Sequence, residues 1–331
     1  MPEDPHVPPP ARAAEASHIF TVQAVESGQK LLQLLQRRLD LPQGLLHRWI
    51  RTGQVRLNGG RAKPFAIVAV GDMVRLPPFA QGMAGRRKES ESAPVAAALP
   101  PLVGRSGDIW AFNKPSGLPT QPGTGHEDSV AGRLAAFYAG QPYIPTPIHR
   151  LDKDTSGILL VAGSFAALSA MTSALRRHEL HKEYLAWVSG SWPHGERRLT
   201  HWLCKANMGT GERMRVSDVP GEGMEASLSV QPLSCGPERS LLLIRLHTGR
   251  THQIRAQLAH MGHPVLGDGK YGTPGSSPRL MLHALRVTLP GGEVFACLPE
   301  WREPFAVSAM PSLPEGLPQG EAGGGGGETR N

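Results

Sequence analysis

A polar turn that runs without a break into an apolar segment is the feature that most constrains this chain. Residues 149–157 read HRLDKDTSG, and residues 158–162 read ILLVA. Five consecutive apolar residues after a cluster of Asp, Lys, Thr, Ser and Gly predict a loop that leads into a buried strand. Functional sites are often built on charged loops that a core strand holds in place. Asp152, which follows a pair of basic residues, is therefore a candidate functional carboxylate.

Two other interpretations fit the composition of this segment. Such a polar cluster is typical of a solvated turn without further function. Asp152, Asp154 and Ser156 also match the opening of an EF-hand calcium loop. That loop needs a bidentate Glu at its last position and a helix on each side, whereas this chain has Gly163 there and a β-type run. We therefore exclude calcium and look for partner residues elsewhere in the chain.

A second segment combines a strand pattern with a lysine and a tyrosine. Residues 181–188, HKEYLAWV, alternate as a strand does, so Tyr184 and Leu185 lie on opposite faces. A tyrosine in a strand ordinarily packs in a core with its hydroxyl hydrogen-bonded. The alternation alone therefore indicates a strand and leaves a functional role for Tyr184 open.

A third segment places two arginines beside a predicted helix start. Residues 241–246, LLLIRL, predict a strand, and after Gly249 the apolar spacing becomes helical from Thr251. This order puts Arg250 and Arg255 near the helix start, where free backbone amides favour anions. By itself, Arg255 would fit an ordinary surface position on a helix equally well.

The charge of the chain favours an anionic partner. Lysine and arginine number 35 against 28 aspartates and glutamates, a net charge of +7 that suits nucleic acid or an acidic membrane surface. No segment is apolar for the length of a membrane span, and the start of the chain lacks the pattern of a secretory signal. Three widely spaced cysteines argue against a disulfide framework and a zinc knuckle. We expect them to be small buried hydrophobes in a cytoplasmic protein.

The N-terminal part of the chain has the pattern of a small basic module. Residues 31–38 and 43–51 predict two short helices, and residues 54–60, 65–70 and 73–76 predict strands. Basic residues far outnumber acidic ones here, as expected of a domain that binds a phosphate backbone. The excess alone fits a solvated basic face equally well. The candidate phosphate contacts in this module are Arg37, Arg38, Arg48, Arg51 and Arg56.

These motifs together resemble those of the RluA-type pseudouridine synthases, which isomerise uridine in RNA. Residues 149–157 resemble the catalytic motif of that family, in which the Asp of His-Arg-Leu-Asp is the essential carboxylate. Lys182 with Tyr184 matches the second motif, and residues 252–255, HQIR, match the third. Residues 113–118, NKPSGL, resemble a further motif that we expect to be structural.

The basic module has a resemblance of its own. Its order of two short helices, RTGQVRLNG and VGDMV is similar to the small RNA-binding domain named after ribosomal protein S-four. The chain departs from that pattern at its first helix, where residues 28–30 read GQK.

The two resemblances imply an α+β pseudouridine synthase fold with a mixed, largely antiparallel sheet, and a small N-terminal α/β RNA-binding module. The expected organisation is a disordered segment at residues 1–18, the S-four-like domain at 19–76, a linker at 77–100, the catalytic domain at 101–310 and a disordered Gly-rich tail at 311–331. Nothing in the sequence demands more than a monomer.

The family resemblance also implies a role for each candidate residue. Asp152 is the catalytic carboxylate, by attack on the sugar or by removal of a sugar proton, and Arg255 is its partner. Tyr184 stacks on the target uracil, and Leu282 packs against it. Arg150 fills the space that the flipped base leaves, and Lys182 and Arg250 contact phosphates. The reaction requires no metal or other cofactor, and the expected partner is structured RNA, ribosomal large-subunit RNA ahead of transfer RNA.

Two rival functions remain at this stage. A non-catalytic RNA-binding or ribosome-assembly factor could keep the fold without the chemistry, although the intact set of Asp152, Tyr184 and Arg255 argues against it. A hydrolase could use Asp152 with His149, His247 or His252, but the chain has no nucleophile-elbow or metal-ligand spacing.

Overall fold

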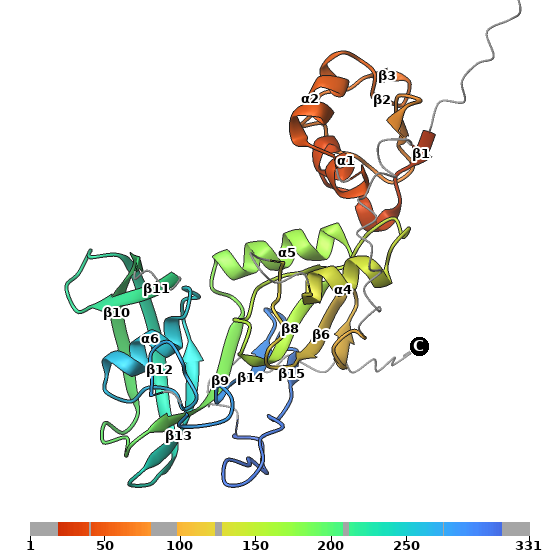
Figure 1. The fold of residues 1–331 in the computed structure, drawn as a ribbon. Helices are drawn as coiled ribbons and strands as arrows, with labels where there is room; N and C mark the ends of the chain where they lie inside the picture. The colour runs from red at the N-terminus through yellow and green to blue at the C-terminus, as the bar shows by residue number, and fades with distance from the viewer. Residues whose placement is uncertain are drawn as a thin grey trace, which may run out of the picture. The chain divides into compact units, whose positions relative to one another are not determined.

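The structure is a computed structural model that describes residues 19–39, 41–80, 98–122, 128–207, 212–273 and 275–312. These residues form two compact units, of which the smaller includes residues 19–80 and the larger includes most of residues 98–312 (Figure 1). The segments predicted to be disordered, except residues 311 and 312, and most of the predicted linker lie outside the described residues.

The smaller unit combines two helices with a four-stranded antiparallel sheet in the order β1-β4-β2-β3. Both predicted helices are confirmed, and the leucines of α1 pack on Leu46, Trp49 and Ile50 of α2 in one apolar cluster. The elements in chain order are β1 (Ile19–Thr21), η1 (Ala24–Glu26), α1 (Leu31–Leu39), α2 (Gln43–Arg51), β2 (Arg56–Leu57), β3 (Gly60–Arg61) and β4 (Met73–Arg75).

The predicted strand at residues 65–70 is wrong. Only Ile67 makes an isolated bridge there, and its side chain is 60% exposed. The backbone here instead forms hydrogen bonds with the first turn of α1. The carbonyl oxygens of Ala66 and of the preceding Pro64 accept from the N–H groups of Leu31 and Leu32. The first amides of a helix have no partner within the helix, and this loop satisfies two of them.

The larger unit is built on an eleven-stranded sheet in the main order β11-β10-β12-β13-β9-β14-β8-β6-β5, with β15 beside β14 and β7 beside β8. Every described pair is antiparallel except β14 and β8, which run parallel, so the predicted mixed and largely antiparallel sheet is confirmed. The strands are β5 (Leu102–Ser106), β6 (Ile109–Lys114), β7 (Thr146–Pro147), β8 (Ser156–Ala162), β9 (His181–Ser189), β10 (Arg197–Asn207), β11 (Glu212–Ser217), β12 (Met224–Cys235), β13 (Arg239–Leu246), β14 (Leu282–Thr288) and β15 (Val294–Ala296).

Three helices accompany this sheet, and they explain why the apolar segment at residues 158–162 has no polar face. α4 (Val130–Phe137) and α5 (Phe165–Arg176) lie along β6 and β8, whereas α6 (Gln253–His260) lies beside β10 and β12 (Figure 1). On β8, Leu159 and Val161 belong to the cluster that includes α4, and Ile158 and Leu160 belong to the cluster that includes Ala174 of α5. A strand covered on both faces reads as a continuous apolar run.

The glycine that ends the polar turn is required by the close approach of two strands. Gly157 has a φ of +109°, and a Cβ at this position would lie 2.2 Å from the carbonyl oxygen of Ala284 on β14. Only glycine fits this backbone and this spacing. It allows β14, which begins at Leu282, to lie beside the end of the Asp152 loop.

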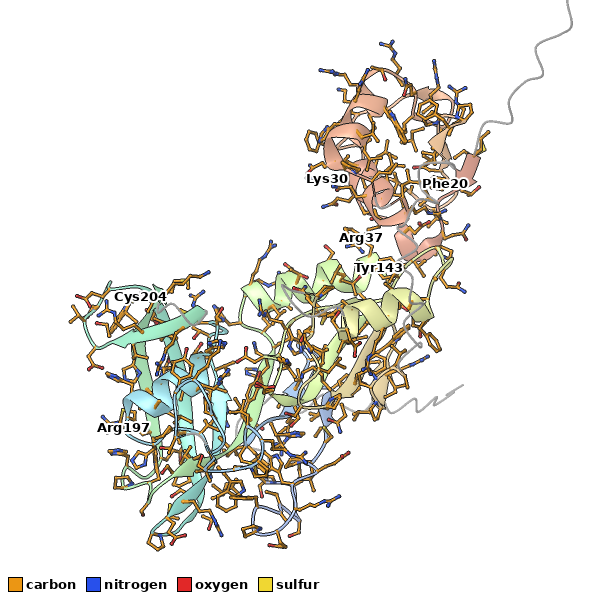
Figure 2. All side chains as sticks on the ribbon, viewed as in Figure 1. Phe20, Lys30, Arg37, Tyr143, Arg197 and Cys204 are labelled. Carbon is orange, nitrogen blue, oxygen red and sulfur yellow. The ribbon has the colours of Figure 1, made fainter. Side chains whose placement is uncertain are left out.

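The cysteine prediction is wrong in part. All three cysteines are free, as expected, but Cys235 is exposed and Cys204 and Cys297 are only partly buried. Cys204 lies on β10 (Figure 2) next to Leu203, which packs in a cluster with Ala256 of α6, so the alternation of the strand turns Cys204 to the other face. In the part of the chain that the structure describes, no helix is long and apolar enough to span a membrane.

Candidate active site

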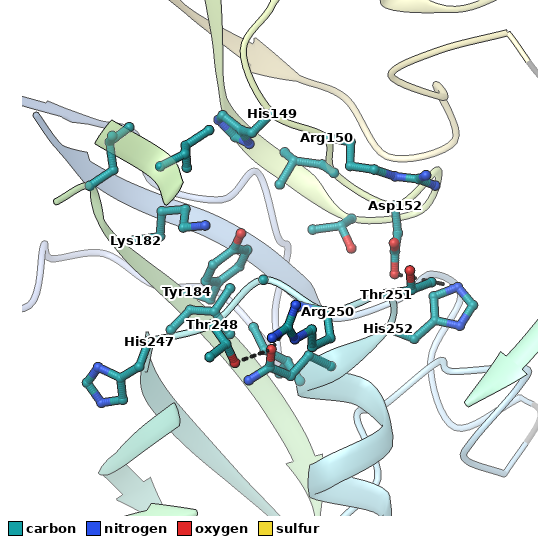
Figure 3. Close-up of a pocket in the computed structure, with 18 of the residues that line it drawn as sticks. His149, Arg150, Asp152, Lys182, Tyr184, His247, Thr248, Arg250, Thr251 and His252 are labelled. Atoms are coloured by element: carbon teal, nitrogen blue, oxygen red, sulfur yellow. Dashed lines mark hydrogen bonds and ion pairs between the residues drawn. The ribbon is translucent and has the colours of Figure 1, made fainter. Parts of the chain in front are cut away.

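Asp152 lies in the loop between β7 and β8, and the backbone of this loop is held from both sides. The hydroxyl of Thr120 accepts from the N–H of Leu151 at 3.0 Å and donates to the carbonyl oxygen of the same residue at 2.9 Å. The N–H of Thr155 donates to the carbonyl oxygen of Asp152 at 3.2 Å, which closes the turn. These bonds fix the position from which the carboxylate of Asp152 projects (Figure 3).

A buried lysine joins this loop to the turn after β6. The ammonium group of Lys114, which has no exposed surface, donates to the carbonyl oxygens of Pro115, Leu118 and Lys153 at 2.9, 2.8 and 3.0 Å. Burial lowers the pKa of Lys114 to about 8, although the charges of nearby aspartates oppose the shift. The motif at residues 113–118 is thus placed where a structural role fits.

Arg255 stands between two carboxylates. Its Nη1 donates to Oδ2 of Asp152 at 3.1 Å, while Nε and Nη2 donate to the two oxygens of Asp268 at 2.7 and 2.8 Å. Burial opposes the charge of Arg255, but the bonds and charges of both aspartates outweigh it and raise the pKa of Arg255. Burial likewise raises the pKa of Asp268, yet Arg255 and two backbone amides lower it below its usual value.

The other predicted catalytic residue lines the same cavity as this pair. A cavity of about 510 Å³ is lined by Asp152, Tyr184, Lys182, Leu282 and Arg255, among others (Figure 3). This volume lies within the range of small-ligand sites, roughly 300–1,000 Å³. Burial and the charge of Asp152 raise the pKa of Tyr184, so its phenol stays protonated at neutral pH. Burial also lowers the pKa of Lys182.

Two predicted substrate residues lie at the margin of this cavity. Arg150 and Arg250 line it, and both side chains are exposed. Arg150, with Asp152, also borders a second cavity of about 580 Å³. Nε of Arg250 donates to the carbonyl oxygen of Glu225 at 3.0 Å, which leaves the ends of its guanidinium available to a ligand.

The three histidines of the hydrolase hypothesis have different surroundings. Nε2 of His149 accepts from the N–H of Leu160 at 3.1 Å, and burial and the charge of Lys182 lower the pKa of His149 to about 3. His247 bonds to the hydroxyl of Ser229 at 2.8 Å. Nε2 of His252 lies 3.9 Å from Oδ2 of Asp152. Among the described residues, none of these three histidines makes a direct hydrogen bond to Asp152, as a general base oriented by that carboxylate would.

Sequence reasoning missed two members of this network. Asp268 orients Arg255, and the hydroxyl of Tyr271 accepts from the N–H of Met214 at 2.8 Å and bonds to Nδ1 of His252 at 3.1 Å. Both residues lie in the loop after α6, and no hydrophobic periodicity in that loop predicts a partner for Arg255. Because Asp268 follows a glycine in a polar segment, its sequence context favours an ordinary turn.

A separate group of polar side chains has the composition of a metal site but the wrong hydrogen bonding. His201, Asp218 and His260 place one ligand atom each within 4.8 Å of one another. The amide nitrogen of Gln257 donates to Nδ1 of His201 at 2.9 Å and to the carbonyl oxygen of Ala226 at 3.1 Å. A neutral His201 therefore carries its proton on Nε2, the atom that faces Asp218, and that nitrogen has no free lone pair for a metal.

The arginines predicted to bind RNA in the smaller unit divide into two kinds. Arg37, Arg48 and Arg51 are exposed, and the last two line a hollow of about 550 Å³ together with His47 and Lys63. Arg38 is instead occupied, because its guanidinium donates to both oxygens of the buried Glu26 at 2.6 and 2.7 Å. Arg56 is partly buried, and its Nη1 donates to the carbonyl oxygen of Gly59 at 3.3 Å.

The chain is similar to proteins of one enzyme family. The family model described as RNA pseudouridylate synthase matches residues 108–260, a range that includes Asp152, Tyr184 and Arg255. The ribosomal large subunit pseudouridine synthase C of Yersinia pestis is 35% identical over 258 residues, which cover 77% of this chain and 79% of that protein. The chain belongs to the RluA-type family of RNA pseudouridine synthases. It is therefore an isomerase that acts on RNA.

Further members and solved structures agree with this assignment. The ribosomal large subunit pseudouridine synthase C of Escherichia coli K12 is 34% identical over 301 residues, covering 83% of this chain and 90% of that protein. The human RNA pseudouridylate synthase domain containing 1 has a TM-score of 0.51 at 27% identity, covering 62% of this chain and 84% of that chain. The predicted pseudouridine synthase fold is thereby confirmed.

Proposed function

We propose that this pseudouridine synthase modifies uridines of large-subunit ribosomal RNA, with Asp152 as its catalytic carboxylate. The observation that carries the assignment of Asp152 is its position. Its carboxylate is the one that Arg255 reaches with Nη1 at 3.1 Å, on the wall of the cavity that also contains Tyr184 and Leu282. Arg255 compensates a negative charge that would otherwise stand in a partly dry site.

The chemistry requires one ionised carboxylate next to the ribose. The N-glycosidic bond breaks, the uracil turns within the cavity, and a bond forms between C5 of the ring and C1′ of the ribose. The ring then loses the proton on C5 and gains one on N1. Both routes open to Asp152, attack on the sugar and removal of a sugar proton, begin from the ionised form. No atom is gained or lost overall, because the product is an isomer of the substrate.

The cavity offers a place for each part of the nucleotide. Tyr184 and Leu282 present the flat and apolar surfaces on which a uracil can stack. Lys182, Arg150 and Arg250 supply positive charge for neighbouring phosphates. Arg150 is exposed beside Asp152, where its side chain can enter the gap left by a flipped base.

The choice of ribosomal RNA rests on the similar proteins and on the basic module. The relatives at 34–35% identity are named for the ribosomal large subunit. We further propose that the smaller unit is an S-four-like RNA-binding domain, in which Arg48 and Arg51 contact phosphates through the hollow that they share with Lys63. The predicted cytoplasmic location and monomeric state stay predictions.

The substrate is tested by mapping pseudouridine in ribosomal and transfer RNA from cells that lack this gene. We expect defined large-subunit sites to disappear and to return when the wild-type chain, but not Asp152→Asn, is supplied. Loss of transfer RNA sites with intact ribosomal sites would replace ribosomal RNA by transfer RNA. If purified wild-type protein bound ribosomal RNA without forming any pseudouridine, the non-catalytic binding factor would be the better account.

A further inference from the structure

His252 has a backbone conformation that the start of a helix does not require. It precedes α6 with a φ of 52° in the left-handed region, and its side chain makes no capping hydrogen bond. Residues at this position are normally extended and cap the helix with a short polar side chain. A left-handed residue other than glycine costs about 1–3 kcal/mol and is found preferentially at functional sites. The consequence here is that the ring of His252 lies beside Asp152 (Figure 3).

The partners of the ring assign its proton. The hydroxyl oxygen of Tyr271 accepts from the N–H of Met214 at 2.8 Å and lies 3.1 Å from Nδ1 of His252. We assign the hydroxyl proton of Tyr271 to Nδ1, because this arrangement gives the hydroxyl both an incoming and an outgoing hydrogen bond. A neutral His252 then carries its own proton on Nε2. Burial, which outweighs the charge of Asp152, lowers the pKa of His252 and favours this neutral form.

The protonated nitrogen lies near the catalytic carboxylate, at a distance that one bridging atom can span. Nε2 of His252 and Oδ2 of Asp152 are 3.9 Å apart, which is too long for a direct hydrogen bond. One oxygen atom between them could accept from Nε2 and donate to Oδ2. Among the oxygen atoms of an RNA chain only a ribose hydroxyl does both, because a carbonyl or a phosphate oxygen has no proton to give and would be repelled by the carboxylate.

We propose that His252 and Asp152 together bind the 2′-hydroxyl of the target ribose. This inference rests on the proposed function, since it takes Asp152 to act at the neighbouring carbon, C1′. The 2′-hydroxyl is the ribose group closest to that carbon that both donates and accepts, and it is the group that distinguishes RNA from DNA. With Oδ2 bonded to the 2′-hydroxyl and to Arg255, Oδ1 is left for the chemistry. Tyr271 is then a positioning residue that acts through His252.

The test combines one change in the enzyme with one change in the substrate. The substrate is a synthetic stem-loop around a mapped target uridine, made with ribose or with 2′-deoxyribose at that nucleotide alone. The enzyme is wild type or His252→Asn, because asparagine tolerates a positive φ but its shorter side chain cannot place a donor at Nε2. The measurement is kcat/KM for pseudouridine formation in all four combinations.

We expect the deoxyribose substrate to lower kcat/KM by about 10-fold to 100-fold, because it loses a hydrogen bond to the charged Asp152 as well as the one to His252. His252→Asn removes one neutral hydrogen bond and should lower kcat/KM on the ribose substrate by about 2-fold to 10-fold. The two changes together should cost little more than the deoxyribose alone, and His252→Gln, whose amide reaches the position of Nε2, should recover part of the loss. If the two losses multiply, or if wild type does not distinguish the two sugars, the inference is overturned. Wild type that is inactive on the ribose stem-loop and on full ribosomal RNA would instead overturn the proposed function.

A second variant, Tyr271→Phe, tests the inference independently in case His252→Asn does not fold. Tyr271→Phe leaves His252 in place and removes the hydroxyl that fixes its proton. We expect it to lower kcat/KM on the ribose substrate and to leave the deoxyribose substrate nearly unaffected. An equal loss on both substrates would indicate a purely structural role for Tyr271 and would contradict the assignment.

Discussion

Arg255 donates hydrogen bonds from two guanidinium nitrogens to Asp268 and from the third to Asp152. The bonds to Asp268 are 2.7 and 2.8 Å long and entirely buried, and the bond to Asp152 is 3.1 Å long at the cavity wall. A two-point pair of this kind fixes the plane of the guanidinium as well as its position. Asp268 therefore determines the direction from which Arg255 meets the proposed catalytic carboxylate.

Asp268→Asn is expected to destabilise the enzyme strongly. The asparagine keeps the shape but removes the charge that compensates Arg255, and breaking a buried pair costs about 3–5 kcal/mol. The free energy of unfolding, measured with urea, should fall by about that amount, and the rate of pseudouridine formation should fall with it because Arg255 loses its orientation.

Asp128→Asn is the matched control for this experiment. Asp128 makes the same two-point contact with Arg133, at 2.8 and 2.6 Å, but its side chain is 57% exposed. Exposed pairs contribute less than about 1 kcal/mol. If both asparagine variants lost equal stability, burial would not be what makes the pair of Asp268 and Arg255 important.

Tyr184 is expected to act mainly through its ring. Because burial and the charge of Asp152 raise its pKa, the phenol stays protonated and can donate a hydrogen bond but cannot act as a ready base at neutral pH. Tyr184→Phe keeps the stacking surface and should lower the initial rate about tenfold, the effect of one hydrogen bond. Tyr184→Leu should lose considerably more activity, since it has no flat ring. Equal rates for the two variants would argue against stacking.

His283 should make the stability of the fold depend on pH. It is buried, with Nδ1 2.9 Å from the hydroxyl of Ser156 and Nε2 2.9 Å from the carbonyl oxygen of Cys297. Burial lowers the pKa of His283 to about 4, against the opposing effect of that carbonyl. In the unfolded chain a histidine binds its proton near pH 6.5, so between the two values the unfolded state holds more protons. Stability is therefore full above about pH 6.5 and is lost toward pH 4, by at most about 1.4 kcal/mol per pH unit.

Urea unfolding at about pH 7 and about pH 5 checks this prediction. His283→Gln cannot take up a proton, so the difference in unfolding free energy between the two pH values should shrink by roughly 2 kcal/mol. Burial also lowers the pKa of His149, so His149 should keep part of the pH dependence of the unfolding free energy in this variant. His178→Asn, at an exposed histidine, should leave the wild-type difference unchanged. A His283→Gln variant with the full wild-type difference would contradict the account.

The basic hollow of the smaller unit should contribute to RNA affinity and not to catalysis. Replacing Arg48 and Arg51 together by glutamine should weaken binding and reduce the slope of log Kd against log salt by about 1 for each lost phosphate contact. The rate at saturating RNA should stay at the wild-type value, because neither residue lines the cavity of Asp152. Arg302→Gln, an exposed arginine of the larger unit, is the control. An unchanged salt slope would remove the hollow from the RNA interface.

The parts of the fold and the site that depend on local composition, hydrophobic order or a short motif could be predicted from the sequence. The turn at Asp152 and its buried strand follow from composition and hydrophobic order, and the motif resemblance named Arg255 although it lies 103 residues away. Asp268 was missed because its pairing arises only when the loop after α6 folds back on that helix. Residues 65–70 were misassigned because a short run of apolar residues predicts a strand, while the tertiary structure uses the carbonyl groups of Ala66 and the preceding Pro64 to complete α1.

The most direct test of the central claim is pseudouridine formation by the purified enzyme on an unmodified large-subunit ribosomal RNA transcript. Asp152→Asn preserves the size of the side chain and removes its charge. The account predicts that wild type forms pseudouridine at defined sites, and that Asp152→Asn binds the same RNA but is slower by about 10³-fold or more. An Asp152→Asn enzyme that modifies the same sites at a rate near that of wild type would contradict it.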